Sequence, residues 1–261
     1  ATQAFTDAMT AMKAVNVGGG QIRWSGTPKI NLVVNTDGIT IRGPGSVNNQ
    51  LPPTGNYLQP WDDADPVIQF GDDTRGTTGS FLRDSMVRGN NTGMYGVVFA
   101  GGSYKNGATN VQILEVRNAL TFESGASHPC VYNIVSGAQL SASGDACTGI
   151  QFIESGTYCT ANAVIGYYVQ FGTGWGWTVR VDSAFSNYVA GGWQQGGVIG
   201  GVLIESNGAT TPTLFLDNSS IEATSKTLMA FKGDDLQDAS FAASGKIWGR
   251  YEVNNNKSFF A

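Results

Sequence analysis

Residues 4–45, AFTDAMTAMKAVNVGGGQIRWSGTPKINLVVNTDGITIRGPG, carry most of the information about the fold. The first part predicts a helix over residues 2 to about 16, because apolar residues recur at helical spacing and three glycines end the run. These apolar residues are Phe5, Ala8, Met9 and Met12. Short apolar strands follow at 21–24, 29–34 and 39–45, and turns rich in Gly, Pro, Asn and Asp separate them. The pattern therefore predicts one helix followed by closely spaced short strands.

This order of elements resembles the opening of the pectate-lyase-like β-helices found in phage tailspikes and related polysaccharide-active proteins. In that family a short helix caps the apolar end of the solenoid, and glycine-flanked apolar strands begin the first coils. The matching positions are Gly19, Gly20, Ile22, Gly38, Ile39, Ile41, Gly43 and Gly45. GTPKIN replaces the more usual Gly-x-Tyr turn, which is a loop-level difference. The resemblance implies an all-β fold, a right-handed parallel β-helix with an N-terminal capping helix.

A repeat over residues 121–206 supports the same fold. An apolar-containing strand that ends in an acid and a serine recurs at TFES (121–124), FIES (152–155), RVDS (180–183) and LIES (203–206). The steps between the acids are 31, 28 and 23 residues. Repeats of this length indicate stacked units that bury a shared core. A β-sandwich or jelly roll also contains many short strands, but it does not explain the helix or the drifting repeat.

We expect one domain over residues 1–261. Its parts are a capping helix and first coils (1–45), a long loop excursion (46–80), stacked coils (81–253), and a tail or the start of a further region (254–261). Within the excursion, Asp62, Asp63 and Asp65 match no calcium-loop spacing, so a solvated acidic turn is favoured over a metal site.

Composition excludes several classes of function. Charged residues make up 13% of the chain, the net charge is −5, and no basic cluster offers a face for nucleic acid. No apolar run approaches the roughly 20 residues that span a bilayer, so membrane insertion is not expected. Three cysteines and one histidine provide neither a disulfide framework nor a zinc site. We predict buried thiols, no metal and no cofactor.

The acid–serine repeat suggests where chemistry could occur. If the four motifs share a register, Glu123, Glu154, Asp182 and Glu205 form a ladder with neighbours roughly 5 Å apart. Paired carboxylates at about 5–5.5 Å or about 6.5–9.5 Å serve retaining and inverting glycosidases, respectively. We therefore predict Glu154 and Asp182 as the catalytic pair, with Glu205 as a third candidate. The alternative is an ordinary polar turn, since acids and serines also bond nearby main chain.

Aromatic residues lie in the same third of the chain. Trp175 and Trp177 in GTGWGW (172–177) share a face if this segment is extended. With Trp193, Tyr158 and Arg180, they are predicted to bind substrate in a saccharide groove over residues 150–205. The alternative is that they fill the core or the contacts between subunits. As the family resemblance implies, Arg180 or Lys105 could instead serve as the base of a lyase.

The resemblance implies a receptor-binding spike of a bacteriophage. We expect a homotrimer on the phage tail, acting outside the host cell on its surface polysaccharide: capsule, O-antigen or exopolysaccharide. Depolymerisation by glycosidic hydrolysis is the favoured activity. The alternatives are a non-catalytic glycan-binding or structural spike, and a polysaccharide lyase, whose unsaturated product would absorb in the ultraviolet.

Overall fold

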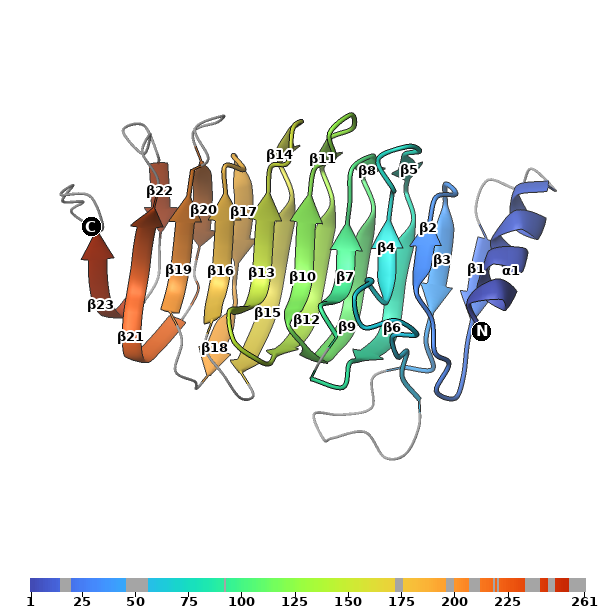
Figure 1. Ribbon diagram of the computed structural model, residues 1–261, viewed down its shortest axis with the longest axis horizontal. Coiled ribbons are helices and arrows are strands. Elements are labelled where there is room, and N and C mark those ends of the chain that lie inside the picture. The colour runs from blue at the N-terminus through green and yellow to red at the C-terminus, as the bar shows by residue number, and fades with distance from the viewer. Residues whose placement is uncertain are drawn as a thin grey trace.

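The chain winds into a parallel β-solenoid with one helix at its N-terminal end (Figure 1). The computed structural model describes residues 1–14, 20–45, 56–91, 93–171, 176–195, 200–206, 212–217, 219, 221–232, 240–243 and 247–253. Strands that are neighbours in space come from successive coils, and they pair in parallel throughout the three sheets. The predicted all-β parallel solenoid is confirmed.

Two long sheets form the walls of the solenoid. The ten-stranded sheet contains β1 (Gly20–Arg23), β3 (Ile39–Arg42), β6 (Phe81–Arg88), β9 (Gly107–Val116), β12 (Ile134–Ala142), β15 (Ala163–Phe171), β17 (Asn187–Ala190), β20 (Thr213–Asp217) and β22 (Ser240–Ala243), with β18 (Trp193–Gln195) also pairing with β15. The nine-stranded sheet contains β2 (Leu32–Val34), β4 (Ile68–Phe70), β7 (Tyr95–Phe99), β10 (Asn118–Glu123), β13 (Cys147–Ile153), β16 (Gly176–Asp182), β19 (Gly200–Glu205), β21 (Ile221–Lys232) and β23 (Ile247–Val253). A short four-stranded sheet joins them along one edge, with β5 (Thr77–Thr78), β8 (Ser103–Tyr104), β11 (Cys130–Val131) and β14 (Cys159–Thr160).

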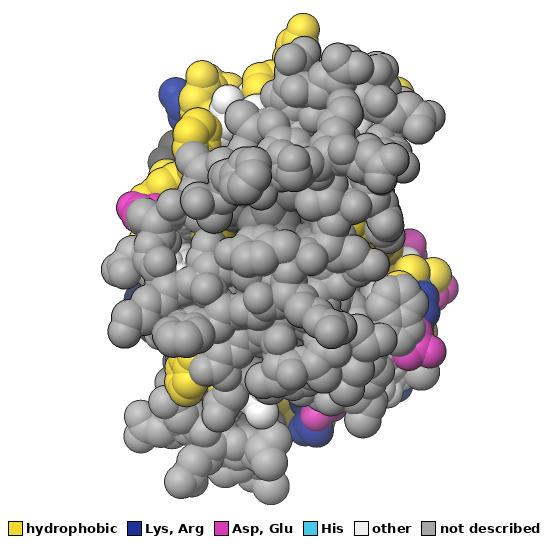
Figure 2. Space-filling view, turned by 90° about the vertical axis from the view of Figure 1, so that its left-hand side faces the viewer, with side chains coloured by type: hydrophobic (Ala, Val, Ile, Leu, Met, Phe, Trp, Pro, Cys, Tyr) yellow, Lys and Arg dark blue, Asp and Glu magenta, His cyan; other side chains and the backbone are white. Residues whose placement is uncertain are grey.

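The predicted helix is α1 (Thr2–Ala14), and it covers the first coil. Phe5 and Met9 are buried and belong to the same apolar cluster as Ile30 and Leu32 of that coil. This packing covers the end of the core, which an uncapped solenoid would expose. No helix among the described residues has the length and apolar character needed to cross a membrane. From the opposite, C-terminal end, described side chains are visible only around the rim of the molecule (Figure 2).

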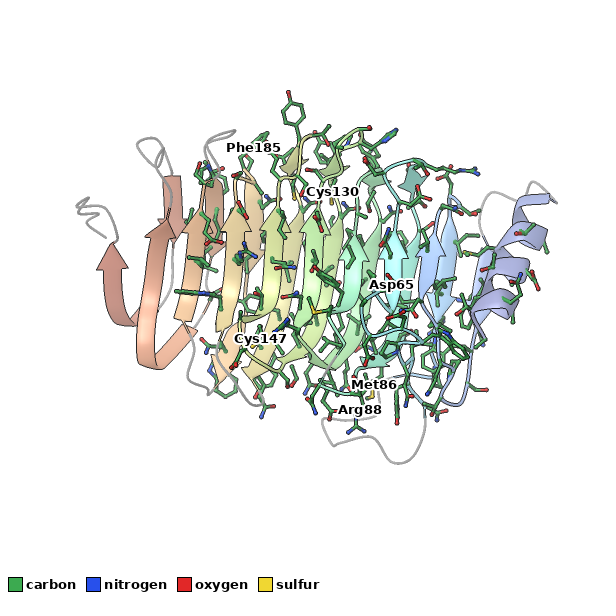
Figure 3. The ribbon with its side chains drawn as sticks, viewed as in Figure 1. Asp65, Met86, Arg88, Cys130, Cys147 and Phe185 are labelled. Carbon is green, nitrogen blue, oxygen red and sulfur yellow. The ribbon has the colours of Figure 1, made fainter. Side chains whose placement is uncertain are left out.

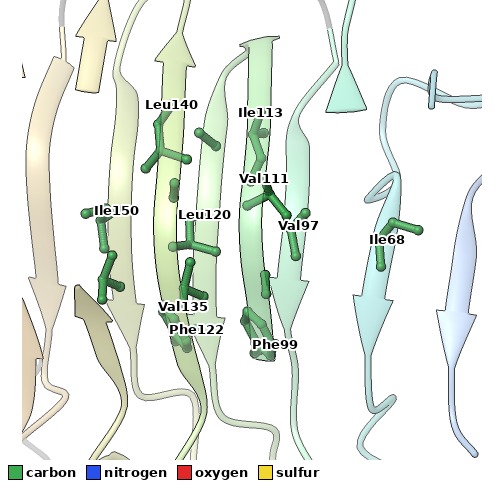
Figure 4. Close-up of a cluster of buried hydrophobic side chains, with 14 of the residues drawn as sticks. Ile68, Val97, Phe99, Val111, Ile113, Leu120, Phe122, Val135, Leu140 and Ile150 are labelled. Carbon is green, nitrogen blue, oxygen red and sulfur yellow. The ribbon is translucent and has the colours of Figure 1, made fainter. Parts of the chain in front are cut away.

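The core lies between the two long sheets and repeats from coil to coil. Phe70, Phe99, Phe122 and Phe152 are fully buried and stack face to face, with centroids 5.1, 4.9 and 5.0 Å apart. These distances match the spacing of paired strands, about 4.7–4.9 Å. Figure 4 shows apolar side chains of both long sheets meeting in this layer. The free thiols of Cys130, Cys147 and Cys159 are also buried, as predicted.

A ladder of buried asparagines runs along the turn that leads into the ten-stranded sheet. The Oδ1 atoms of Asn133, Asn162 and Asn187 each accept the main-chain N–H of the asparagine one coil earlier, starting from Asn106, at 3.0–3.1 Å. Each Nδ2 also donates to a main-chain carbonyl, for example Asn133 to Ser103 at 3.1 Å. The ladder therefore satisfies polar groups that are buried at the turn.

Part of the predicted excursion over 46–80 belongs to the coils, since β4 and β5 lie within it. The side chain of Asn31, which directly precedes β2, anchors the acidic turn at residues 61–66. The Asn31 amide accepts the main-chain N–H groups of Trp61 and Asp62, and it donates to the carbonyls of Asp65 and Pro66. This anchoring fixes the turn against the first coils.

Asp73, between β4 and β5, ties its own coil to the coil two further along. Its carboxylate accepts the main-chain N–H groups of Ala126, Ser127 and His128 at 3.0, 3.1 and 2.8 Å. A side chain at Gly101, in the intervening coil, would collide with this carboxylate. Burial acts to raise the pKa of Asp73, but the three hydrogen bonds outweigh it and lower that pKa below its ordinary value of 3.8.

Replacing Asp73 with asparagine is expected to lower the melting temperature near neutral pH. A carboxylate with a lowered pKa contributes stability above its unfolded pKa, and this contribution is lost as the pH falls through the folded pKa. The difference in melting temperature between wild type and Asp73→Asn should therefore shrink below about pH 4. Asp65→Asn, at an exposed position, is the control. A difference that stays constant down to acidic pH would contradict the role of the charge.

Candidate functional site

Three of the four repeated acids form one row on the outside of the nine-stranded sheet. Its register pairs Glu123 with Ile153, Ile153 with Asp182, and Asp182 with Glu205. Phe122, Phe152, Val181 and Ile204 point into the core, so the residues that follow them point outward. From Glu123 to Glu205 the row therefore contains three carboxylates and one isoleucine, and Lys232 on β21 is next in register.

Glu154 lies outside this row, which corrects the predicted ladder. The motif FIES has one more residue between its core phenylalanine and its acid than TFES, RVDS and LIES have. Ile153 therefore takes the outward position, and Glu154 comes after the end of β13 with only 8% of its surface exposed. Its main-chain N–H donates to the carbonyl of Asp182. Aligning the motifs on their core residues, instead of on their acids, would have revealed this offset.

Arg180 binds both carboxylates of the Asp182–Glu205 pair. Its Nε lies 2.7 Å from Glu205 Oε2, and its Nη2 lies 3.1 Å from Asp182 Oδ2. All three side chains are largely buried, with Asp182 and Glu205 each 23% exposed. Burial raises the pKa of Asp182, and the nearby Glu205 carboxylate adds to this shift although Arg180 opposes it. The pair thus combines a carboxyl group with a raised pKa, Asp182, with a second carboxyl group that shares the same guanidinium.

A second polar feature lies beside this pair on the same wall. Gln151 is in register with Thr121 and with Arg180, and its Nε2 donates to Thr121 Oγ1 at 2.8 Å. Trp177, predicted to bind substrate, is half-buried at the start of the same strand, β16. Arg180, Asp182 and Glu205 are therefore brought together on β16 and β19, and Trp177 lies on the same strand as Arg180.

The other predicted substrate-binding residues lie elsewhere. Trp193 is on β18 in the ten-stranded sheet, whose outer face points away from the nine-stranded sheet because the core lies between them. Tyr158 directly precedes β14 of the short sheet, and its ring meets Phe185 edge to face at 5.8 Å. Figure 3 labels Phe185 at this edge of the solenoid. Trp175 lies outside the described residues. The single cleft predicted over residues 150–205 is therefore divided between separate surfaces.

Trp193 lines a groove on the outer face of the ten-stranded sheet. One outward row of this sheet contains Gln112, Gln139, Tyr168 and Trp193, which are neighbours in register on successive coils. Gln112 Nε2 donates to Gln139 Oε1 at 3.0 Å, and the rings of Tyr168 and Trp193 lie 5.5 Å apart. Trp193 is 46% exposed. The row thus combines linked amides at one end with a displayed aromatic pair at the other.

The floor of the groove is a column of residues with left-handed backbone. Asn110, Gly137, Gly166 and Gly191 have φ angles of 54°, 63°, 64° and 61°, one on each successive coil. A left-handed residue within a strand bends it, as in a β-bulge, and glycine adopts this conformation without steric cost. Because each coil bends at the same place, the wall becomes concave there. Three of the four positions also lack a side chain, which leaves the floor open.

The groove has a volume of about 1070 Å³ and an uncharged lining. Its lining residues are Asn110, Val111, Gln112, Gly137, Ala138, Gln139, Gly166, Tyr167, Tyr168, Gln170, Gly191 and Trp193. Amides both donate and accept hydrogen bonds, as sugar hydroxyls require. Aromatic rings offer flat apolar faces to the C–H faces of a sugar ring. This chemistry suits a carbohydrate.

Two solved structures share the architecture of this chain. A tailspike protein from Acinetobacter baumannii bacteriophage Fri1, a capsular polysaccharide depolymerase, matches 88% of this chain with 12% sequence identity and a TM-score of 0.53. An alginate lyase from Paenibacillus sp. str. FPU-7 matches 95% of this chain and 94% of its own, with 9% identity and a TM-score of 0.57. The fold is the parallel β-helix. This chain spans 48% of the length of the tailspike, and no family model or curated protein matches its sequence.

Most groove residues of this β-helix were missed by the sequence analysis. Their signal is a second repeat, a left-handed residue followed two positions later by Gln, Tyr or Trp. It occurs as NVQ (110–112), GAQ (137–139), GYY (166–168) and GGW (191–193). The steps of 27, 29 and 25 residues are again one coil each. Searching for a glycine, instead of an acid, at the coil period would have found the groove.

Proposed function

We propose that this β-helix binds a bacterial surface polysaccharide in the groove of its ten-stranded sheet and cleaves such chains by hydrolysis. The observation that carries the proposal is the row of Gln112, Gln139, Tyr168 and Trp193 above a floor of three glycines and Asn110. The row crosses three steps between coils, about 14 Å in all. That length accommodates a short stretch of a sugar chain running along the solenoid axis.

The uncharged lining favours uncharged sugars in the groove itself. A carboxylate or phosphate placed there would lose part of its hydration without meeting an opposite charge, which is unfavourable. Hydroxyl groups, in contrast, can be satisfied by the side-chain amides of Gln112, Gln139 and Gln170.

Hydrolysis is assigned to the opposite wall, to Asp182 and Glu205. Their positions are neighbours in register, so they stand about 4.8 Å apart at the main chain, near the carboxyl separation of retaining glycosidases. In this proposal, Asp182 gives its proton to the glycosidic oxygen while Glu205 attacks the anomeric carbon. Water, deprotonated by Asp182, then releases the sugar from Glu205. The groove binds one stretch of the polymer, and Asp182 and Glu205 on the nine-stranded sheet hydrolyse another stretch.

A lyase is the less favoured reaction. Elimination by Arg180 would require its guanidinium to contact the substrate, whereas its Nη2 and Nε are already bound to Asp182 and Glu205. A glycan-binding spike without catalysis is the remaining alternative, and it predicts binding with no shortening of the chains.

The place of action follows from the tailspike resemblance. We propose that the chain is part of a homotrimeric spike on a bacteriophage tail, acting at the surface of the host bacterium. The tailspike depolymerase among the structures of similar fold supports this assignment.

Replacing Trp193 with alanine is expected to weaken polysaccharide binding about tenfold, a loss of about 1.4 kcal/mol. The change removes the exposed half of the aromatic pair and leaves the core intact. Binding is measured by calorimetry or affinity electrophoresis with purified bacterial polysaccharides.

Tyr158→Ala is the matched control, because Tyr158 is also an exposed aromatic residue but lies outside the groove.

A second variant, Gly166→Asn, should weaken polysaccharide binding, because it places a side chain on the floor of the groove. Asparagine tolerates a left-handed backbone, as Asn110 shows in the same column, and a Cβ at Gly166 meets only Gly137, at 3.9 Å. Unchanged binding in both groove variants, or an equal loss in Tyr158→Ala, would place the sugar elsewhere.

A further inference from the structure

Three arginines stand side by side on the first coils of the ten-stranded sheet. Arg23 on β1 pairs in register with Arg42 on β3, and Arg42 pairs with Arg83 on β6. All three are exposed. Neighbours in this row are about 4.8 Å apart at the main chain, and like charges placed directly opposite each other destabilise a sheet. The row thus concentrates positive charge in a chain whose net charge is −5.

The surroundings neutralise this charge only in part. In the described part of the chain, the three guanidiniums make one ion pair, between Arg42 Nε and Asp84 Oδ2 at 2.9 Å. Arg23 Nε donates to the neutral side chain of Gln21 at 2.7 Å, and Arg83 lies over the ring of Phe81. Three positive groups therefore face one carboxylate.

Arg23 and Arg42 open onto a hollow of about 470 Å³, which we call the arginine hollow. Trp24, Asp84 and the main chain of residues 43–45 complete its lining. Gly45 has open space where a side chain would be. The hollow is therefore accessible from outside.

Trp24 lies between the arginine hollow and the core. This residue is 92% buried, and its indole N–H finds no acceptor among the residues that the structure describes. Its ring packs in the apolar core, so it borders the hollow on the inner side. Two outward-facing guanidiniums, both of them donors, thus line one space.

We propose that the arginine hollow binds an oxyanion: a carboxylate, phosphate or sulfate group. Guanidinium groups recognise such groups through paired, charge-assisted hydrogen bonds. The group can be a free anion or an acidic substituent of a polysaccharide. The second source rests on the proposed function, and the position of the hollow favours it. Asp84 precedes Asn110 in the left-handed column that forms the groove floor, so the hollow continues the groove at its N-terminal end.

The first test uses free anions. Inorganic phosphate and sulfate are titrated into wild type, Arg23→Gln and the double variant Arg23→Gln/Arg42→Gln at constant ionic strength, followed by NMR of the Trp24 indole N–H. We expect a saturable shift of this signal in wild type and at least tenfold weaker binding in the double variant. Arg23→Gln breaks no ion pair, so it should weaken binding without unfolding the first coil. Arg75→Gln, an exposed arginine on another edge, is the control and should bind as wild type does.

The second test distinguishes the two sources. An acidic polysaccharide and its carboxyl-reduced, neutral form are compared for binding to wild type, Arg23→Gln and Trp193→Ala. If the hollow binds an acidic substituent of the polysaccharide, Arg23→Gln weakens binding of the acidic form only, whereas Trp193→Ala weakens binding of both forms. If phosphate binds at the hollow but neither polysaccharide binds to the protein, the oxyanion site is supported and the proposed polysaccharide-binding function is contradicted. Equal anion binding by wild type and the double variant, or the same loss in Arg75→Gln, would overturn the anion site.

Discussion

Replacing Glu205 with glutamine is expected to reduce polysaccharide cleavage by about 10²–10⁴-fold and to leave binding in the groove unchanged. The amide keeps the size of the side chain but cannot attack the anomeric carbon. Asp182→Asn should cause a comparable loss, because it removes the proton donor. Cleavage is measured by the size distribution of the polysaccharide after digestion, and binding is measured on the same preparations.

The nine-stranded wall offers matched controls for this experiment. Glu123 lies in the same row but two coils from Asp182, where it accepts a hydrogen bond from Ser155. Glu123→Gln should therefore retain activity. Glu154→Gln tests the other member of the pair predicted from the sequence, and a loss equal to that of Glu205→Gln would include Glu154 in the reaction. Full activity in both Asp182→Asn and Glu205→Gln would reject this pair.

The pH dependence provides a second readout of the same pair. Burial raises the pKa of Asp182 above its ordinary value of 3.8, and only the protonated form can donate to the glycosidic oxygen. The rate should therefore fall as the pH rises through this raised pKa. New ultraviolet absorbance in the product would instead indicate elimination.

Replacing Asn133 with leucine is expected to destabilise the solenoid by roughly 2–6 kcal/mol, about 1–3 kcal/mol for each of two buried groups left without a partner. These groups are the main-chain N–H of Asn106 and the hydroxyl of Ser103, both of which donate to Asn133 Oδ1. Whole domains are commonly stable by only about 5–15 kcal/mol, so the loss is a large fraction. It is measured from the midpoint of urea unfolding, followed by circular dichroism.

Gln139→Leu is the control for this substitution. It makes the same change from amide to leucine within β12, the strand that Asn133 directly precedes. Gln139 lies in the groove, where water can accept the hydrogen bond that Gln112 Nε2 would lose. We expect this variant to unfold within about 0.5 kcal/mol of wild type. If Asn133→Leu is as stable as Gln139→Leu, the asparagine ladder does not hold the turns together.

The elements of this protein could be predicted because their signals are local. Alternating apolar residues such as Ile39 and Ile41 indicate a strand with one buried face, and the buried pattern of β3 agrees. Phe5 and Met9 indicate a helix with one apolar side, and both are buried in α1. The coil-length repeat then implied stacking, which the parallel pairing of the strands confirms.

The composition of each wall could not be predicted in the same way. A single residue, Ile153, moves Glu154 out of the row that contains Asp182 and Glu205. Trp193 is only eleven positions from Asp182 in the sequence, yet the two belong to different sheets because the chain turns between β16 and β18.

The strands, the turns, the cap and the approximate length of a coil follow from short-range patterns of side-chain size and polarity. The neighbours of a side chain on the surface of the solenoid do not follow from such patterns, because they come from residues 19 to 41 positions away. Which residues meet there depends on how many residues each turn consumes and on how core side chains such as Phe122 and Phe152 stack. That register is a property of packing between coils, and it placed the carboxylate pair, the groove and the arginine hollow.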